Sequence, residues 1–374
     1  MSKRTVALGL LLIVGLLLGG RFLLSHNSPG DQAQRDELVE RFPALATGEE
    51  AILFAGDTLW TRDYRPFTKE HGLDYPAQAV MPLVASAQAV AFVGNLEGPI
   101  TKERKRCPPK KNWNYRSRPR DRKVLPKIGF THLSLANNHA LDRCAKGMND
   151  TRNYLTELGI LSFGAGDTFE EAIKPAVIEI GGIRVAVVGG MESWKHYREA
   201  DWGATDERAG VFLMSKRDIP RALQAARNDA DAVVAFAHWG SNYRPVSKAQ
   251  RRIAGRLING GADLVIGHHG HMAQQFGMYK GKPTVWGLGN FLFGTPGRFG
   301  HDKMQPGYGL LVRLVVKDQT LNRLELIPLR LNNRLTEFQP RLCTVSESEE
   351  VLRSLISKGD DNITVRDGVA IFPL

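Results

Sequence analysis

The chain has 374 residues, of which 43% are hydrophobic and 24% charged, a composition typical of a globular protein. A core of the size this allows needs no disulfides for its stability, which excludes the small disulfide-dependent class. The net charge of +11 is uneven, because residues 102–123 hold eleven Lys or Arg against two acidic residues and so contribute +9 of it.

The N-terminus has the features of an export segment. Lys3 and Arg4 precede an apolar stretch over residues 5–20, and Arg21 is followed by three further apolar residues. A snorkelling Arg21 extends the apolar length to about 20 residues, enough to span a bilayer. There is no small-x-small cleavage site, so we predict an uncleaved anchor at 1–24 with the remainder on the outer face of the cytoplasmic membrane. A cleaved signal peptide, the alternative, leaves the protein in the same compartment.

The rest of the chain is organised simply. Residues 25–50 are polar and are predicted to form a stalk, and residues 51–345 one domain. Apolar residues at helical spacing predict helices over 145–158, 216–228 and 247–259. Strand-like runs alternate with these helices up to about residue 290, which indicates βαβ units.

The C-terminal part has a different pattern. Two long strand-like runs, 308–318 and 321–331, are predicted to form an antiparallel hairpin. Residues 346–374 then read as a helix and a strand packed on the domain.

Six short polar motifs follow strand-like runs in chain order. They are Gly56-Asp57, Asn95-Leu96-Glu97, Asn137-Asn138-His139, His238-Trp239-Gly240, the run from Gly267 to His271, and Gly289-Asn290-Phe291. In an open α/β sheet, ligands bind outside the carboxyl ends of the strands. The motifs therefore predict one shared site at the strand ends.

The individual motifs differ in weight. Asp57 and Glu97, taken alone, are better explained by a helix or turn cap and by a solvated loop residue. His238 is evenly balanced between a core residue and a ligand. Gly267-His268-His269-Gly270-His271 is the strongest, because it holds three of the ten histidines in the chain and Gly270 gives the backbone freedom to aim two rings at one point.

The side chains together predict a metal centre. Carboxylates, an amide oxygen and imidazoles suit Mn, Zn or Fe rather than calcium. There are enough ligands for two metals if one carboxylate bridges them, an arrangement used in hydrolysis of phosphate esters and amides. His139 carries a titratable group at the site, and Asp142 is placed to hold its ring by a hydrogen bond.

The three cysteines leave two interpretations open. Cys107 and Cys144 both lie in loops near site motifs, and an exported protein allows a disulfide between them. Three unrelated thiols are equally compatible with the sequence, and Cys343 is left over in either case.

The ordered motifs resemble those of the CapA family of bacterial capsule proteins, implicated in poly-γ-glutamate synthesis and similar in fold to calcineurin-like metallophosphoesterases. The resemblance runs from about Ala51 to at least Phe293. It implies a four-layer αββα sandwich of the metallo-dependent phosphatase type, holding one or two divalent metals. It also implies residue roles: His139 as general acid supported by Asp142, with metal ligands Asp57, Glu97, Asn138, His238, His269 and His271.

The sequence departs from the family pattern at several positions. Leu59 stands where the phosphoesterase pattern has a His, and the bridging position is Glu97 instead of Asp. Asn242 replaces a Glu, and the last histidine motif reads GHHGH rather than GHHPH. The pair among His268, His269 and His271 that coordinates therefore stays open.

The basic stretch lies between the second and third motifs, and a basic loop beside a metal site attracts anionic substrates. A solvated loop, or a contact with anionic lipid head groups, is the alternative explanation. We predict that Arg116 and Arg118 bind substrate, together with Asn95 and Asn290 at the strand ends. An exported domain is not expected to bind nucleic acid.

Three functions are compatible with these observations. The first is a membrane-anchored, metal-dependent hydrolase or transferase acting on polyglutamate or another anionic envelope polymer. The second is an extracytoplasmic phosphoesterase on small or lipid phosphates. The third is a non-catalytic subunit that holds the polymer or the polymer synthase at the membrane.

Overall fold

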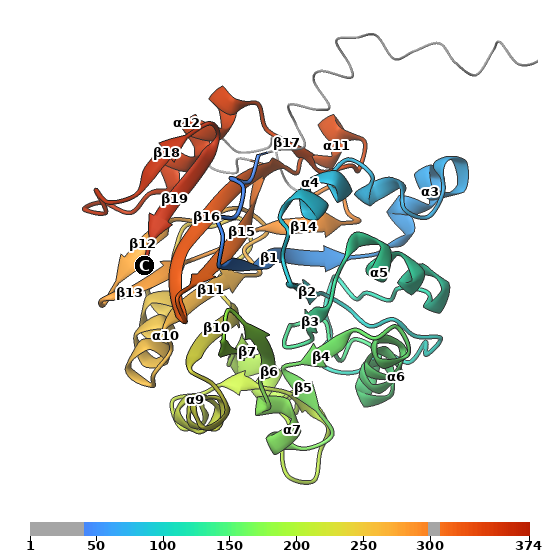
Figure 1. Ribbon diagram of the computed structural model, residues 1–374. Helices are drawn as coiled ribbons and strands as arrows, with labels where there is room; N and C mark the ends of the chain where they lie inside the picture. The colour runs from blue at the N-terminus through green and yellow to red at the C-terminus, as the bar shows by residue number, and fades with distance from the viewer. Residues whose placement is uncertain (1–40, 298–306) are drawn as a thin grey trace, which may run out of the picture. The chain divides into compact units, whose positions relative to one another are not determined.

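Residues 41–297 and 307–374 are described by the computed structural model, which builds them from two large β-sheets flanked by helices (Figure 1). The predicted anchor at 1–24 and most of the predicted stalk lie outside the described residues. Within the described residues, no helix is both long enough and apolar enough to cross a membrane. The first described residues belong to the packed domain, since Phe42 is buried and Arg313 donates a hydrogen bond to the Pro43 carbonyl.

The first sheet has ten strands and is centred on β1 (Glu49–Leu59). Its main order is β18-β19-β16-β15-β1-β2-β3-β4, with β14 paired to β1 and β17 to β16. The predicted hairpin is confirmed as the antiparallel pair β15–β16. The other strands of this sheet are β2 (Ala91–Leu96), β3 (His132–Ser134), β4 (Leu161–Phe163), β14 (Asn290–Phe293), β15 (Tyr308–Lys317), β16 (Thr320–Arg330), β17 (Arg341–Leu342), β18 (Thr364–Arg366) and β19 (Val369–Pro373).

The second sheet has seven strands in the order β12-β13-β11-β10-β7-β6, with β9 beside β7. Its central strands β7, β10, β11 and β13 are parallel. The strands are β6 (Ala176–Ile180), β7 (Ile183–Glu192), β9 (Leu213–Met214), β10 (Ala232–His238), β11 (Leu264–His268), β12 (Phe276–Tyr279) and β13 (Lys282–Val285). A separate two-stranded pair joins β5 (Ala165–Gly166) to β8 (Gly210–Val211).

The helices lie in the connections between strands (Figure 1). All three predicted helices are confirmed to within two residues at each end, as α6 (Cys144–Glu157), α9 (Asp218–Asp229) and α10 (Lys248–Asn259). The other α-helices are shorter or C-terminal: α3 (Arg65–His71), α4 (Met81–Ser86), α5 (Leu125–Ile128), α7 (Phe169–Ile173), α8 (Lys195–Glu199), α11 (Asn333–Thr336) and α12 (Val345–Leu355). Short 3-10 segments are η1 (Arg62–Tyr64), η2 (Tyr75–Ala77) and η3 (Pro119–Val124).

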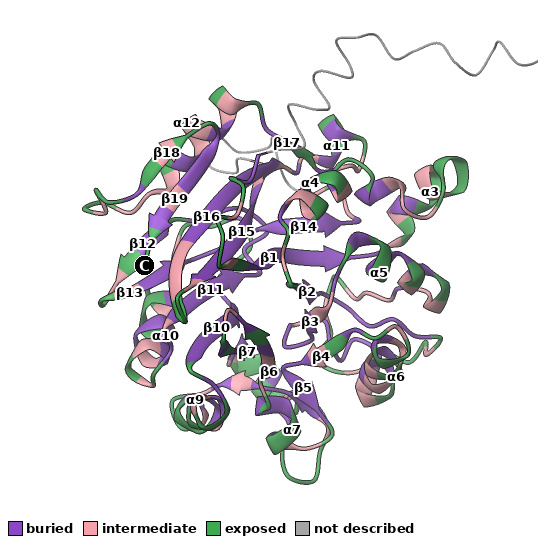
Figure 2. Ribbon diagram, in the orientation of Figure 1, coloured by how far each residue is buried: buried purple, intermediate pink, exposed green. Residues whose placement is uncertain are grey.

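The core has two layers, and the side chains of β10 point alternately into one and the other. On β10, Val234 and Phe236 point into a cluster shared by the two sheets, where they meet Phe54 of β1. Val233 and Ala235 point the other way, into a second cluster with α9 and α10. Successive side chains of a strand face opposite sides, so both faces of β10 are buried and its sequence is continuously apolar (Figure 2). The protein is therefore a mixed α/β fold with several sheets.

A buried ion network holds the N-terminal end of this core. Arg313 and Glu325, on neighbouring positions of β15 and β16, form a salt bridge and are both fully buried. Glu325 also accepts a hydrogen bond from Arg323 Nε at 2.8 Å, and Arg323 pairs with Glu49 at 2.7 Å. Glu325 thus neutralises two guanidinium groups, one of them with no access to water.

Replacing Glu325 with glutamine is expected to lower the free energy of unfolding by about 3–5 kcal/mol, because it leaves the buried Arg313 charge unpaired. Denaturant unfolding of the two proteins measures the difference. Glu199→Gln is the matched control: it breaks an exposed pair with Lys195 and is expected to cost less than about 0.5 kcal/mol. Equal effects of the two substitutions would contradict the role given to the network.

Candidate metal centre

The predicted strand-end residues of both sheets meet at one place. Asp57 lies near the end of β1, Glu97 directly after β2, His238 at the end of β10 and His268 at the end of β11. With His269 and His271, these residues form three overlapping groups, in each of which the ligand atoms lie within 4.8 Å of one another. The groups are Asp57, His238 and His268; Glu97, His238 and His269; and Asp57, Glu97 and His271. All six side chains are buried.

Gly56 allows β1 to bring Asp57 to this point. A Cβ atom at position 56 would lie 1.8 Å from the Gly289 carbonyl oxygen, so only glycine fits where β1 approaches the start of β14. The Asp57 amide donates a hydrogen bond to the same carbonyl at 3.0 Å. Gly56 is therefore required by the contact between the two strands.

Asp57 is the most highly contacted group of the centre. Its Oδ1 accepts a hydrogen bond from Asn95 Nδ2 at 2.8 Å and lies 3.1 Å from His268 Nδ1. Its Oδ2 accepts from the His269 amide at 3.0 Å and lies 3.5 Å from His271 Nδ1. Burial raises the pKa of Asp57, but hydrogen bonds from His268 and His271 outweigh it and hold the pKa well below its ordinary value. Asp57 is thus an anion in the protein interior.

Glu97 is a buried carboxyl that no described group satisfies. Neither of its oxygens has a hydrogen-bond partner among the described residues, and His139 Nε2 lies 3.9 Å from Oε1. Burial and the neighbouring Asp57 raise the pKa of Glu97 well above its ordinary value. Buried polar atoms are almost always partnered, so this carboxyl is built for a group that supplies positive charge. The residues present therefore fit a divalent metal.

His238 and His269 are candidate neutral nitrogen ligands. Burial and neighbouring imidazoles lower the pKa of His238 well below its ordinary value, and they lower that of His269 to about 3. Nε2 of His268 and Nδ1 of His269 have no hydrogen-bond partner among the described residues. Neutral imidazoles with unused nitrogens are the form in which histidine binds metals.

The backbone of the histidine motif differs from the prediction. His269 and His271 themselves adopt positive φ angles of 89° and 56°, whereas Gly270 does not. The ring directions thus come from two non-glycine residues in a sparsely populated conformation. His268, left open by the sequence, joins the group with Asp57 and His238.

Three amides surround the ligands. Asn138 Oδ1 lies 2.8 Å from His238 Nε2, so this predicted ligand is at the centre. Asn95 and Asn290, predicted to bind substrate, are buried and used within the protein. Asn95 donates to Asp57 and accepts from Asn137 Nδ2 at 3.0 Å, and Asn290 Oδ1 lies 2.8 Å from His271 Nδ1. Both side chains thus contact candidate ligands, Asp57 and His271.

His139 and Asp142 form a hydrogen-bonded pair at the edge of the centre. His139 Nδ1 lies 2.8 Å from Asp142 Oδ2, as the sequence spacing predicts, and its Nε2 faces Glu97. Burial and the nearby Lys111 lower the pKa of His139 to about 4. The Asp142 carboxylate also accepts a hydrogen bond from the Tyr115 amide at 2.6 Å.

Lys111 is a site residue that sequence reasoning missed. Its Nζ bonds to Asp142, donates to the Asn138 carbonyl at 2.6 Å and lies 4.5 Å from the centre of the Trp202 ring. The side chain is only 11% exposed. The sequence feature that could have pointed to Lys111 was the possible disulfide, one of the two interpretations left open. Cys107 and Cys144 do form it, and it ties the basic loop carrying Lys111 to the start of α6.

The two arginines predicted to bind substrate are separated by the fold. Arg118 donates to both oxygens of Asp121, at 3.0 and 2.9 Å, and so stabilises the first turn of η3. Arg116 lines a cavity of about 450 Å³ that also contains Tyr115, whose ring centre is 4.4 Å from that of His139. The structure thus places Arg116, but not Arg118, beside the centre.

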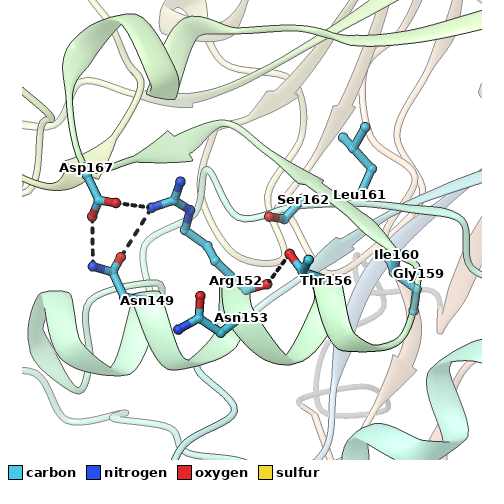
Figure 3. Close-up of a pocket in the computed structure, with 9 residues that line it drawn as sticks. All are labelled: Asn149, Arg152, Asn153, Thr156, Gly159, Ile160, Leu161, Ser162 and Asp167. Atoms are coloured by element: carbon cyan, nitrogen blue, oxygen red, sulfur yellow. Dashed lines mark hydrogen bonds and ion pairs between the residues drawn. The ribbon is translucent and has the colours of Figure 1, made fainter.

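A larger cavity, of about 660 Å³, lies along α6 (Figure 3). Arg152 bonds there to Asp167 and Glu171, both at 2.8 Å, and Asn149 bonds to Asp167. None of the six ligand candidates lines it. Its charges are neutralised internally, so it carries no argument for a ligand.

Comparison with known proteins identifies relatives along most of the chain. The model of a family described as bacterial capsule synthesis protein PGA_cap matches residues 51–295. A capsule biosynthesis protein CapA of Bacillus anthracis is 28% identical over 98% of this chain and 87% of its own length. A probable polyglutamine synthesis accessory protein of Mycobacterium tuberculosis is 30% identical over 92% of this chain and 91% of its own length.

Two solved structures are also similar to this chain. One is a calcineurin-like phosphoesterase of Bacillus subtilis, with a TM-score of 0.43 and 15% identity over 73% of this chain and 87% of that one. The other is a hypothetical protein of Thermus thermophilus, with a TM-score of 0.44 and 16% identity over 74% and 98% of the two chains.

Proposed function

We propose that this chain, which belongs to the bacterial capsule synthesis protein family, is a metal-dependent hydrolase or transferase. Its proposed substrate is an anionic envelope polymer such as polyglutamate. The family membership confirms the resemblance predicted from the six motifs. The observation that carries the proposed activity is the buried ligand cluster with an unsatisfied Glu97 at its middle. The relatives are named for capsule and polyglutamine synthesis, which supports the polymer class.

The ligand set proposed for the centre is Asp57, Glu97, Asn138, His238, His269 and His271, with His268 added by its contact with Asp57. Asp57, Glu97 and His238 each belong to two of the three ligand groups, so one or two ions of Mn, Zn or Fe are proposed. When bound, such a metal supplies Lewis-acid stabilisation of developing negative charge. The proposed fold is the αββα sandwich of the metallo-dependent phosphatases, built from the two packed sheets and their helices.

His139 is the proposed proton-transfer group. Its Nε2 faces the centre, and Asp142 at 2.8 Å from Nδ1 orients the ring and stabilises the charged imidazole. Hydrolysis of a glutamyl amide breaks the C–N bond and joins a water oxygen to the carbonyl carbon. His139, which its lowered pKa keeps neutral before the reaction, takes up the proton that the attacking water loses and delivers it to the leaving amine, while the other water proton stays on the new carboxyl group.

The proposed location is the outer face of the cytoplasmic membrane, where the N-terminal segment would hold the chain near polymer synthase subunits. A disulfide between Cys107 and Cys144 is consistent with an exported protein. The polymer substrate, the membrane and the synthase are the partners proposed for this chain.

Turnover assays test the proposal. The full-length chain, purified in mild detergent and loaded with Mn or Zn, is incubated with a γ-linked glutamate decamer, and products are resolved by mass spectrometry. Shortened or transferred γ-glutamyl chains are expected, and none from an Asp57→Asn variant. Hydrolysis of an aryl phosphate alone would favour the phosphoesterase alternative. A metal-loaded protein that turns over neither substrate would favour a polymer-binding subunit.

A further inference from the structure

Five arginines line the cavity beside the centre, which we call the arginine cavity. They are Arg62, Arg65, Arg106, Arg116 and Arg143, and they come from three separate parts of the chain. The cavity has a volume of about 450 Å³ and includes Trp113 and Tyr115 in its wall. Among the described residues that line it, Asp63 is the single acidic one.

Arg62 pairs with Asp63 at 3.7 Å, but most of the positive charge of this cavity is not neutralised by ion pairs of the described residues. No carboxylate of the described residues lies within ion-pair distance of Arg106, Arg116 or Arg143, whereas Arg118 and Arg122 of the same basic stretch are paired with Asp121 and Glu157. Arg116 and Arg143 donate only to backbone carbonyls, of Lys102 and Asp142. Within one basic stretch, some guanidinium groups are thus used by the fold and others are left for a ligand.

Arg143 carries a buried hydrogen-bond donor without a partner among the described residues. Its residue is only 7% exposed, and its Nε has no hydrogen-bond partner among the described residues. Burial and the charges of Arg106 and Arg116 lower the pKa of the Arg143 guanidinium, against the opposing effect of the Asp142 carboxylate. Like charges held together around a buried donor destabilise the empty cavity and are compensated when an anion enters.

A covalent bond holds these charges together. Cys107 follows Arg106 and Cys144 follows Arg143, and the disulfide between them brings their Cα atoms to 5.2 Å. The bond therefore keeps two arginine-bearing segments in place against their mutual repulsion. This arrangement would be unexpected if the basic stretch were only a solvated loop.

The arginine cavity adjoins the candidate metal centre. The Tyr115 ring forms part of its wall and lies against His139, and the Tyr115 amide bonds to Asp142. Arg143 directly follows Asp142 and donates to its carbonyl at 2.7 Å. An anion in the cavity is therefore next to the group proposed to transfer the proton.

We infer that the arginine cavity binds side-chain carboxylates of a polyanionic chain while a neighbouring bond of that chain lies at the metal centre. This inference rests on the proposed function and names its substrate class. Five guanidinium groups around 450 Å³ exceed what one small anion needs, whereas consecutive carboxylates spaced along a polymer match several separate donors.

Binding of a fluorescent γ-linked glutamate decamer to the full-length chain in detergent tests the inference. Fluorescence anisotropy on metal-free protein gives the dissociation constant without any need for turnover. Arg116→Gln and Arg106→Gln are each expected to weaken binding about tenfold, the effect of losing one charge-assisted contact. Arg143→Gln is expected to weaken it at least as much, but the two more exposed variants keep the test valid if Arg143→Gln misfolds.

Arg120→Gln is the matched control, because it removes the same charge from the same stretch at a side chain that is 72% exposed and outside the cavity. It is expected to change binding less than about twofold. Equal weakening by Arg120→Gln and Arg116→Gln would overturn the inference in favour of a diffuse basic surface. Tighter binding of a polyphosphate of equal length, lost in the same variants, would overturn the carboxylate assignment.

The proposed hydrolase activity and the proposed binding by the arginine cavity can be contradicted independently of each other. Decamer binding that depends on Arg106 and Arg116 without turnover by the metal-loaded protein would uphold the cavity and contradict the hydrolase. Turnover with a KM unchanged in Arg106→Gln and Arg116→Gln would uphold the hydrolase and contradict binding by the arginine cavity.

Discussion

Replacing Asp57 with alanine is expected to remove the metal from the protein. The wild-type chain, purified without chelators or reconstituted with Mn or Zn, should carry about one to two equivalents, and the variant less than about a tenth of one. Asp57 contacts His268 and His271 and lies in two of the three ligand groups, so its loss breaks the shared part of the centre. Elemental analysis measures the content directly.

A second readout checks that the effect is at the centre. Metal binding stabilises the folded state, so a chelator should lower the Tm of the wild-type protein but leave that of Asp57→Ala unchanged. His269→Ala should behave as Asp57→Ala does, whereas His71→Ala, at an exposed side chain, should retain the metal. A wild-type chain that takes up neither Mn nor Zn would contradict the proposed hydrolase activity. Polymer binding or assembly would then be the function best supported by the family membership.

The position of the candidate centre followed from the sequence because its main determinants are local. An apolar run buried on both faces can be recognised as a strand, and polar residues directly after several such runs must meet where parallel strands end. Asp57, Glu97, His238 and the histidines of residues 268–271 were found in this way, and the structure brings them within reach of one another. Helices α6, α9 and α10 were equally accessible through their periodicity.

Contacts between distant segments were beyond this reasoning. Nothing in the spacing of Arg116 and Arg118 shows that one meets Asp121 and the other a cavity, since that depends on the path of an irregular loop. Lys111 meets Asp142 from a loop that the disulfide ties to the start of α6 and that Trp202 Nε1 contacts at the Pro108 carbonyl, neither of which the spacing of the sequence shows. The inward roles of Asn95 and Asn290 likewise depend on which strands become neighbours in the sheet.

The largest effect on catalysis without loss of the metal is expected from His139. His139→Gln should lower kcat on the γ-linked glutamate decamer by about 10²–10⁴-fold, the usual contribution of a positioned proton-transfer group. Its metal content should stay at the wild-type level, because His139 is outside the three ligand groups. Single-turnover kinetics with elemental analysis of the same samples separates loss of chemistry from loss of metal.

Matched substitutions decide between a catalytic and a structural role for His139. His132→Gln changes a half-buried histidine of β3 whose ring contacts Thr131, so it should leave kcat within about twofold. Asp142→Asn keeps the shape of the pair but removes the charge that orients the imidazole, and its kcat should fall between those of wild type and His139→Gln. Wild-type turnover by His139→Gln would show that the proton comes from another group, and the pairing with Asp142 would then serve only to hold the Lys111 loop against α6.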